Sequence, residues 1–143
     1  MRVMAIDYGD ARTGVAISDP SGLLTGFTTV IHSRNRETVL AQLAALCKER
    51  GADRLVMGFP RNMDGTEGPR AALYREFAAS LEEAAGMPVR LWDERRTTVE
   101  AHQILSSQNY HGKKRKNTVD AVAASLILEG YLGYLRNHPE EVS

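Results

Sequence analysis

The stretch from residue 3 to residue 18 constrains the fold most strongly. Residues 3–6 are an apolar, partly β-branched run that is too short for a helix and ends at the carboxylate of Asp7. Gly9 and Gly14 bracket a tight reversal, and residues 14–18 then return as a second strand. We therefore predict an N-terminal β-hairpin whose buried first strand ends in an acid. Such an acid is costly to desolvate unless a hydrogen bond or a metal compensates it.

Length and composition limit the protein classes that need to be considered. The 143 residues predict one domain over residues 1–136 and a C-terminal tail over residues 137–143. With 18 acidic and 18 basic residues, the overall charge attracts neither nucleic acid nor membrane, so a polyanion site requires local clustering. The lone Cys47 predicts a buried thiol and a reducing compartment. Without a leader pattern or an apolar run of about 20 residues, we expect a cytoplasmic protein with no membrane partner.

The remaining chain alternates strand and helix patterns. Strands are predicted at residues 28–31, 54–57 and 88–92. Helices are predicted up to Gly51, from the end of the loop at residues 61–68 up to Gly86, over residues 97–107, and from residue 117 or 118 to about residue 135. Ser33 or Asn35 would cap the first helix, Gly51 would end it, and Leu73, Phe77 and Leu81 would form one face of the second. This order predicts an α/β fold with a mixed central sheet, antiparallel in the hairpin and parallel later, flanked by helices.

Acidic residues recur where the predicted strands end. Carboxyl ends of parallel strands share one edge of a sheet, so Asp7, the loop after Gly58 and the Asp93–Glu94 pair are expected to meet there. Asp120 begins a helical stripe that continues through small and apolar residues to Tyr131. An acid in a first helical turn is commonly only a favourable charge at the positive end of the helix dipole. Its position on the buried stripe nevertheless favours a helix that brings Asp120 to the same edge.

Three acids at one site require a compensating cation. Oxygen ligands without a thiol or a paired histidine favour Mg²⁺ or Mn²⁺, and two such ions can activate a water and stabilise the leaving oxygen of a phosphodiester. The basic run Lys113, Lys114, Arg115 and Lys116 precedes Asp120 and could hold the flanking phosphates, although such runs are usually solvated loops. The sequence therefore favours metal-assisted hydrolysis of a nucleic-acid backbone.

Four motifs at their spacings resemble the YqgF (RuvX) family over essentially the whole chain. They occupy residues 7–16, 58–66, 93–98 and 113–124. The resemblance implies an RNase H-like fold related to the Holliday-junction resolvase RuvC, and a nuclease that matures the 5′ end of the small-subunit (16S) ribosomal RNA precursor. It also implies that Asp7, Glu94 and Asp120 bind the metal ions. Strand alternation lets only one of Asp93 and Glu94 face the site; spacing alone does not choose between them, and the resemblance favours Glu94.

Other candidate contacts and other functions remain open at this point. Arg12 is a candidate phosphate contact or a salt-bridge partner, Asn62 lies in a substrate loop or a plain connection, and Arg95 is a further candidate substrate contact. The alternatives to an RNA-maturation enzyme are a four-way-junction DNA resolvase, an ATP-handling phosphotransferase, for which the chain is too short, and a non-catalytic nucleic-acid-binding module. The protein would act as a monomer or a homodimer, and resolving a symmetric junction would favour the dimer.

Overall fold

The computed structural model describes residues 1–22, 24–60, 67–93 and 112–141. Its elements are β1 (Val3–Asp7), β2 (Arg12–Ser18), β3 (Thr25–His32), α1 (Arg36–Arg50), β4 (Arg54–Phe59), α2 (Arg70–Ala85), β5 (Val89–Asp93), α4 (Gly112–Asn137) and the short 3₁₀ helix η2 (Pro139–Glu141). The helix predicted over residues 97–107 lies outside the described residues. No helix among the described residues is both long enough and apolar enough to span a membrane.

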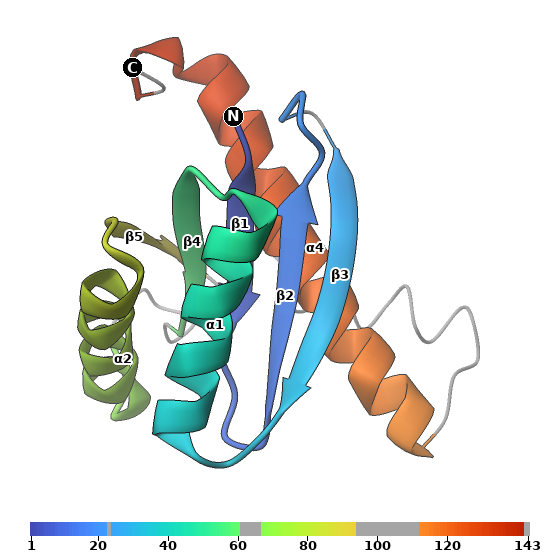
Figure 1. The fold of residues 1–143 in the computed structure, drawn as a ribbon, viewed down its shortest axis with the longest axis vertical. Coiled ribbons are helices and arrows are strands. Elements are labelled where there is room, and N and C mark those ends of the chain that lie inside the picture. The colour runs from blue at the N-terminus through green and yellow to red at the C-terminus, as the bar shows by residue number, and fades with distance from the viewer. Residues whose placement is uncertain (23, 61–66, 94–111, 142–143) are drawn as a thin grey trace.

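The strands form one mixed sheet in the order β3-β2-β1-β4-β5 (Figure 1). The hairpin strands β1, β2 and β3 pair antiparallel, whereas β1, β4 and β5 run parallel. The predicted α/β class and the mixed sheet are confirmed. We call the edge where β1, β4 and β5 begin the amino edge, and the edge where they end the carboxyl edge.

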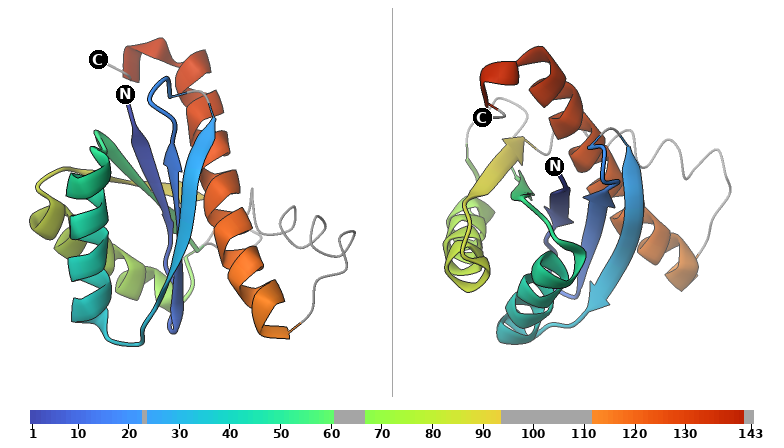
Figure 2. Two further views of the ribbon diagram at one scale, coloured as in Figure 1. Left: turned by 45° about the vertical axis from the view of Figure 1, so that its right-hand side comes forward. Right: turned by 45° about the horizontal axis from the view of Figure 1, so that its top comes forward.

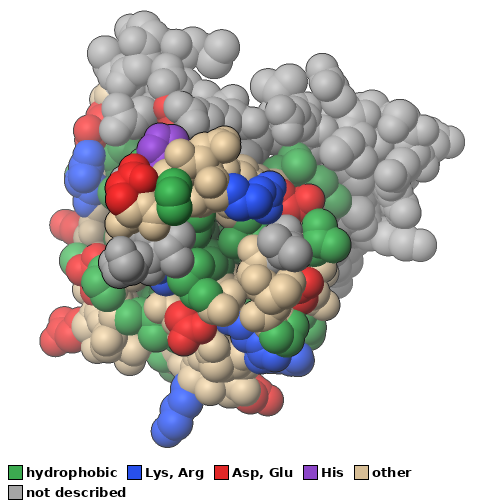
Figure 3. Space-filling model, turned by 90° about the horizontal axis from the view of Figure 1, so that it is seen from above, with side chains coloured by type: hydrophobic (Ala, Val, Ile, Leu, Met, Phe, Trp, Pro, Cys, Tyr) green, Lys and Arg blue, Asp and Glu red, His purple; other side chains and the backbone are tan. Residues whose placement is uncertain are grey.

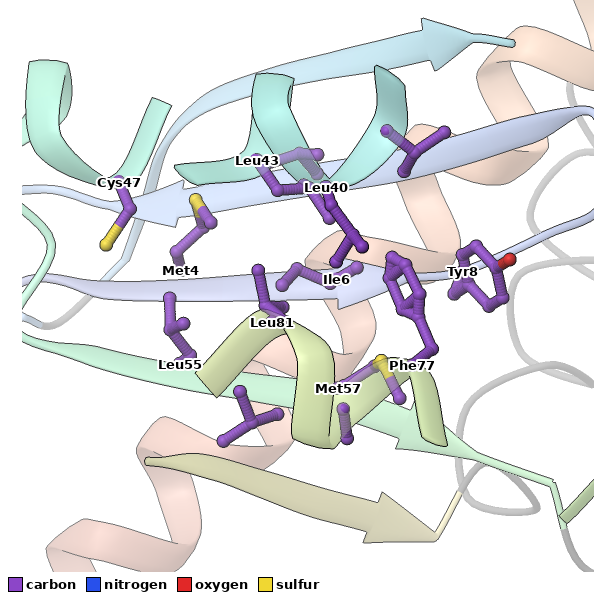
Figure 4. Packing of buried hydrophobic residues seen from close by; sticks show 14 of the residues in the cluster. Met4, Ile6, Tyr8, Leu40, Leu43, Cys47, Leu55, Met57, Phe77 and Leu81 are labelled. Atoms are coloured by element: carbon purple, nitrogen blue, oxygen red, sulfur yellow. The ribbon is translucent and has the colours of Figure 1, made fainter. Parts of the chain in front are cut away.

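Helices cover both faces of the sheet. Helices α1 and α2 lie on one side and α4 crosses the other (Figures 1 and 2). Side chains of β1 alternate between these layers: Met4 and Ile6 pack with α1 and α2 (Figure 4), whereas Val3 and Ala5 pack with α4. We refer to the two sides as the α1/α2 face and the α4 face. The alternation decides which side each site residue occupies.

Local sequence signals set both ends of α1. The side chain of Asn35 caps α1 by accepting a hydrogen bond from the Thr38 N–H at 3.0 Å, and α1 ends at Gly51, whose φ of 66° is left-handed. Cys47 lies in α1 and its side chain is buried, as predicted.

Two helical predictions were wrong in detail. Leu73 is 39% exposed, because the buried stripe of α2 runs through Tyr74, Phe77 and Leu81 and leaves Leu73 beside it. Helix α4 begins at Gly112, several residues before the predicted start. The basic run lies within this helix, and lysine and arginine are good helix formers, so their charge was a poor indicator of a loop.

Candidate active site

Asp7 is the last residue of β1 and lies at the carboxyl edge. It follows Val3 and Ala5 in the strand alternation, so its side chain belongs to the α4 face. Its partner across the antiparallel ladder is Gly14 of β2. The side chain is partly buried, and the predicted hairpin with an acid at the end of its first strand is confirmed.

Gly14 is the point at which α4 meets the sheet. A Cβ atom added to Gly14 would lie 2.2 Å from the carbonyl oxygen of Asp120 and 2.7 Å from its carbonyl carbon. Only a residue without a side chain allows two backbones to approach so closely. The stripe below Asp120 is buried as predicted, through Ala124, Ile127 and Tyr131. Asp7 and Asp120 are therefore neighbours of the same glycine, one across the ladder and the other across the sheet–helix interface.

The carboxylate of Asp120 forms an ion pair with Arg12. The Arg12 Nε–H donates to Oδ2 of Asp120 at 2.9 Å, and the side chains are 36% and 21% exposed. Burial raises the pKa of Asp120 above its ordinary value. The hydrogen bond and charge of Arg12 and the charge of His32 lower this pKa and offset part of the shift. Arg12 and His32 are partners in the β2–β3 ladder, so the hairpin presents both groups to Asp120. The salt-bridge alternative for Arg12 is present in the structure; its contact with a phosphate stays a prediction.

Asp93 lies on the other face of the sheet. It ends β5 and lines a cavity of about 400 Å³ with Phe59, Arg75 and Leu91. Leu91 packs with the α1/α2 core, whereas Trp92, between Leu91 and Asp93, packs against α4. Strand alternation thus assigns Asp93 to the face opposite Asp7.

Three predicted site residues, Glu94, Arg95 and Asn62, lie outside the described residues. Lys113, Lys114, Arg115 and Lys116 lie on the first turns of α4, ahead of Asp120, and the described structure does not include their side chains. The basic run and Asp120 therefore lie on one helix, and not in a loop and a following helix as predicted. The contact of the basic run with substrate phosphates stays a prediction.

The turn after Asp7 is fixed from α2, which sequence reasoning did not anticipate. The Tyr74 hydroxyl donates to the carbonyl oxygen of Tyr8 at 2.7 Å, and the Tyr8 ring stacks on Phe77 with centroids 3.8 Å apart. Arg70, one helical turn before Tyr74, forms an ion pair with Asp10 at 3.0 Å. The four-residue spacing of Arg70 and Tyr74 was a visible signal that both face one neighbour, but it did not identify that neighbour.

The donor set fits a hard divalent cation. Asp7 and Asp120 both adjoin Gly14, and carboxylate oxygens are ligands that Mg²⁺ and Mn²⁺ prefer. Within the described ranges, no group of three or more His, Cys, Asp or Glu side chains gathers in a metal-binding arrangement. A complete site would therefore need a ligand from elsewhere in the chain.

Comparisons with known proteins show the family to which the chain belongs. Residues 1–134 match the family model described as "RuvX: Holliday junction resolvase". The chain is 44% identical over 134 residues to a Halothermothrix orenii protein named "Putative pre-16S rRNA nuclease", covering 94% of this chain and 96% of that protein. A Moorella thermoacetica protein of the same name is 43% identical over 135 residues, covering 94% and 96%.

A solved structure resembles the fold. The structure titled "T. thermophilus RuvC in complex with Holliday junction substrate" has a TM-score of 0.61 and 14% sequence identity, and covers 96% of each chain. At this identity the similarity shows the fold alone.

Proposed function

Because the chain belongs to the RuvX family, we propose that it is a divalent-metal-dependent endonuclease that matures the 5′ end of the 16S ribosomal RNA precursor in the cytoplasm. The observation that carries this proposal is the meeting of Asp7 and Asp120 at Gly14. Two acids that adjoin one glycine at the carboxyl edge of a sheet would be costly for a purely structural role, since each would be desolvated near a like charge.

Asp7, Asp120 and Glu94 are the proposed metal ligands. Asp93 is a poor alternative to Glu94 because it lines the cavity on the α1/α2 face with Phe59. The next residue along an extended strand would return to the α4 face, which favours Glu94. A cation held there would offset the charge of the acids, activate a water and stabilise the leaving oxygen of the phosphodiester.

The remaining proposed roles belong to cationic and polar side chains. Arg12 forms an ion pair with Asp120, and we propose that it exchanges this contact for a substrate phosphate. The basic run at the start of α4 would hold the phosphates that flank the scissile bond. Asn62 and Arg95 are proposed as further substrate contacts.

A four-way DNA junction is the second candidate substrate. It is favoured by the description of the family model, which names a Holliday junction resolvase. Symmetric cleavage of a junction requires two active sites, so this alternative predicts a homodimer, whereas a single cut in a precursor RNA needs only a monomer.

The deciding experiment compares cleavage of the two substrates with Mg²⁺ and with Mn²⁺. We expect metal-dependent cleavage of the precursor RNA that is lost in Asp7→Asn. The matched control is Glu49→Gln, which removes the same charge from an exposed position near the end of α1, at the amino edge. Cleavage that survives Asp7→Asn in a preparation free of contaminating nucleases would refute the assignment. Tight RNA binding without cleavage under either metal would favour a non-catalytic binding module.

A further inference from the structure

The ion pair between Arg12 and Asp120 puts a positive charge directly on a proposed metal ligand. Arg12 is the first residue of β2, and its Nε–H donates to Oδ2 of Asp120 at 2.9 Å. Because a guanidinium group is not deprotonated in a protein, this charge is present at every physiological pH. Any second cation that binds Asp120 therefore meets it at short range.

Arg12 is the counter-ion of Asp120 in the structure. The Asp120 side chain is only 21% exposed, so its negative charge has little contact with water. Burial raises the pKa of Asp120, whereas the hydrogen bond and the charge of Arg12 lower it. His32, the partner of Arg12 in the β2–β3 ladder, acts on Asp120 through its charge in the same direction. Arg12 thus supplies part of the compensation that a metal ion would also supply.

A divalent cation and Arg12 compete for the same carboxylate. Two like charges within a few ångströms repel strongly in a partly buried site, because the effective dielectric constant there is well below that of water. Arg12 also uses a lone pair of Oδ2, which a metal would otherwise be able to take. A metal on Asp120 is therefore bound more weakly while Arg12 stays in this contact.

Arg12 is able to leave Asp120 for another anion. Its side chain is 36% exposed, so an anion in solution can reach it. Arginine binds a phosphate through two parallel N–H donors, and this geometry is stronger than the one hydrogen bond between the Arg12 Nε–H and Asp120. A phosphate of a bound nucleic-acid strand therefore competes with Asp120 for the guanidinium group.

We propose that Arg12 couples metal binding to substrate binding: it opposes the metal at Asp120 until a phosphate of the substrate strand takes its guanidinium group. The inference rests on the proposed function, because it takes Asp120 to be a metal ligand. Removing the charge of Arg12 should then tighten metal binding to the free protein. Because coupling between two ligands is reciprocal, the metal should strengthen RNA binding by the same factor by which RNA strengthens metal binding.

The test measures Mn²⁺ binding and not cleavage. Free Mn²⁺ would be quantified by its electron paramagnetic resonance signal in titrations of wild type, Arg12→Gln and Arg12→Lys without RNA. Arg12→Gln should bind Mn²⁺ about tenfold more tightly, a factor typical of coupled sites. Arg12→Lys keeps the positive charge and should stay within about twofold of wild type.

The matched control is Arg136→Gln. Arg136 is exposed and lies in the last turn of α4, which ends at the amino edge, away from Asp120. Figure 3 looks onto this edge and shows basic side chains interspersed with acidic and hydrophobic ones, rather than one continuous basic surface. The substitution should leave the Mn²⁺ affinity unchanged. An equal gain in affinity in Arg136→Gln would assign the effect to net charge and overturn the inference.

A second titration adds a saturating 12-nucleotide RNA, kept cold and checked on a gel to be intact. RNA should tighten Mn²⁺ binding to wild type more than to Arg12→Gln, because the variant has already lost the opposing charge. An equal gain in both proteins would overturn the inference. A wild-type protein whose Mn²⁺ affinity does not change with RNA would overturn it without any variant.

The outcomes separate this inference from the proposed function. If Asp120→Asn abolishes Mn²⁺ binding while Arg12→Gln leaves it unchanged, the metal ligand is correct and the coupling through Arg12 is wrong. If Asp120→Asn binds Mn²⁺ as tightly as wild type, the proposed metal site is wrong and the inference falls with it. A protein that shows the Arg12 effect but never cleaves RNA would refute the proposed nuclease and leave the coupling in place.

Discussion

Replacing Gly14 by alanine tests whether the close approach of α4 to β2 assembles the active site. The new Cβ would lie 2.2 Å from the Asp120 carbonyl oxygen, whereas ordinary contact begins at 3.4 Å, so α4 must retreat by about 1 Å. The obstacle is backbone on both sides, and no side-chain rotation relieves it. Overpacking of this kind costs about 1–3 kcal/mol, which corresponds to a fall of about 3–10 °C in Tm for a chain of this length. The same displacement separates Asp120 from Asp7, and an error of about 1 Å can reduce catalysis about a hundredfold.

The assay pairs thermal unfolding with cleavage of the precursor RNA. Gly133→Ala is the matched control: it lies on α4, where the added Cβ would meet the Arg136 guanidinium at 3.6 Å. It should leave cleavage unchanged and raise stability by up to about 1 kcal/mol, because alanine is the better helix former. If Gly14→Ala melted and cleaved as wild type, the contact between α4 and β2 would not determine the site geometry.

Three further substitutions test a buried hydrogen bond to β1, the hydrogen bond that holds the turn after Asp7, and the buried charge of Asp120. Ser18→Ala removes the buried hydroxyl that accepts the Val3 N–H at 2.8 Å, so it should cost about 1–3 kcal/mol in a urea titration, and an unchanged midpoint would contradict this. Tyr74→Phe leaves the Tyr8 carbonyl without its buried donor, so it should cost about 1 kcal/mol and also slow cleavage; a slower reaction without any loss of stability would contradict this. Because burial raises the pKa of Asp120, ionising it at neutral pH destabilises the fold, so Asp120→Asn should abolish cleavage but raise Tm at pH 7. That gain should vanish as the pH falls below about 3.9, the ordinary aspartate value, and a constant gain at all pH values would refute the assignment.

Features encoded by neighbouring residues could be predicted from the sequence. The cap at Asn35 and the stop at Gly51 depend on a side chain and its own backbone, so the residue types were sufficient. The hairpin ending at Asp7 follows from a short apolar run and two glycines. That Asp120 lies at the same end of the sheet as Asp7 could be predicted, because the alanines on α4 indicated a close approach of this helix to the sheet.

Features that depend on the partner element could not be predicted. Gly14 was predicted only to bracket the hairpin reversal, and nothing near it in the sequence indicated that the backbone of Asp120 would lie against it. The choice between Asp93 and Glu94 likewise depends on which face of β5 receives α4, and that is known only once Trp92 is seen packed against the helix. Period-two alternation gives relative faces and leaves the absolute assignment to tertiary packing.

The close contact at Gly14 brings Asp120 to the candidate active site and also makes its ionised carboxylate costly to bury. By bringing α4 onto β2, it buries Asp120 far enough to raise the pKa of that carboxyl, and Arg12 offsets only part of the penalty. A residue serving only stability would be better as asparagine, which could still accept a hydrogen bond from Arg12 without a buried charge. Retaining an acid there is therefore reasonable only if something gains from the negative charge. Under the proposed function, a cation shared with Asp7 would be attracted by that charge and would also remove the penalty that Asp120 imposes on the fold.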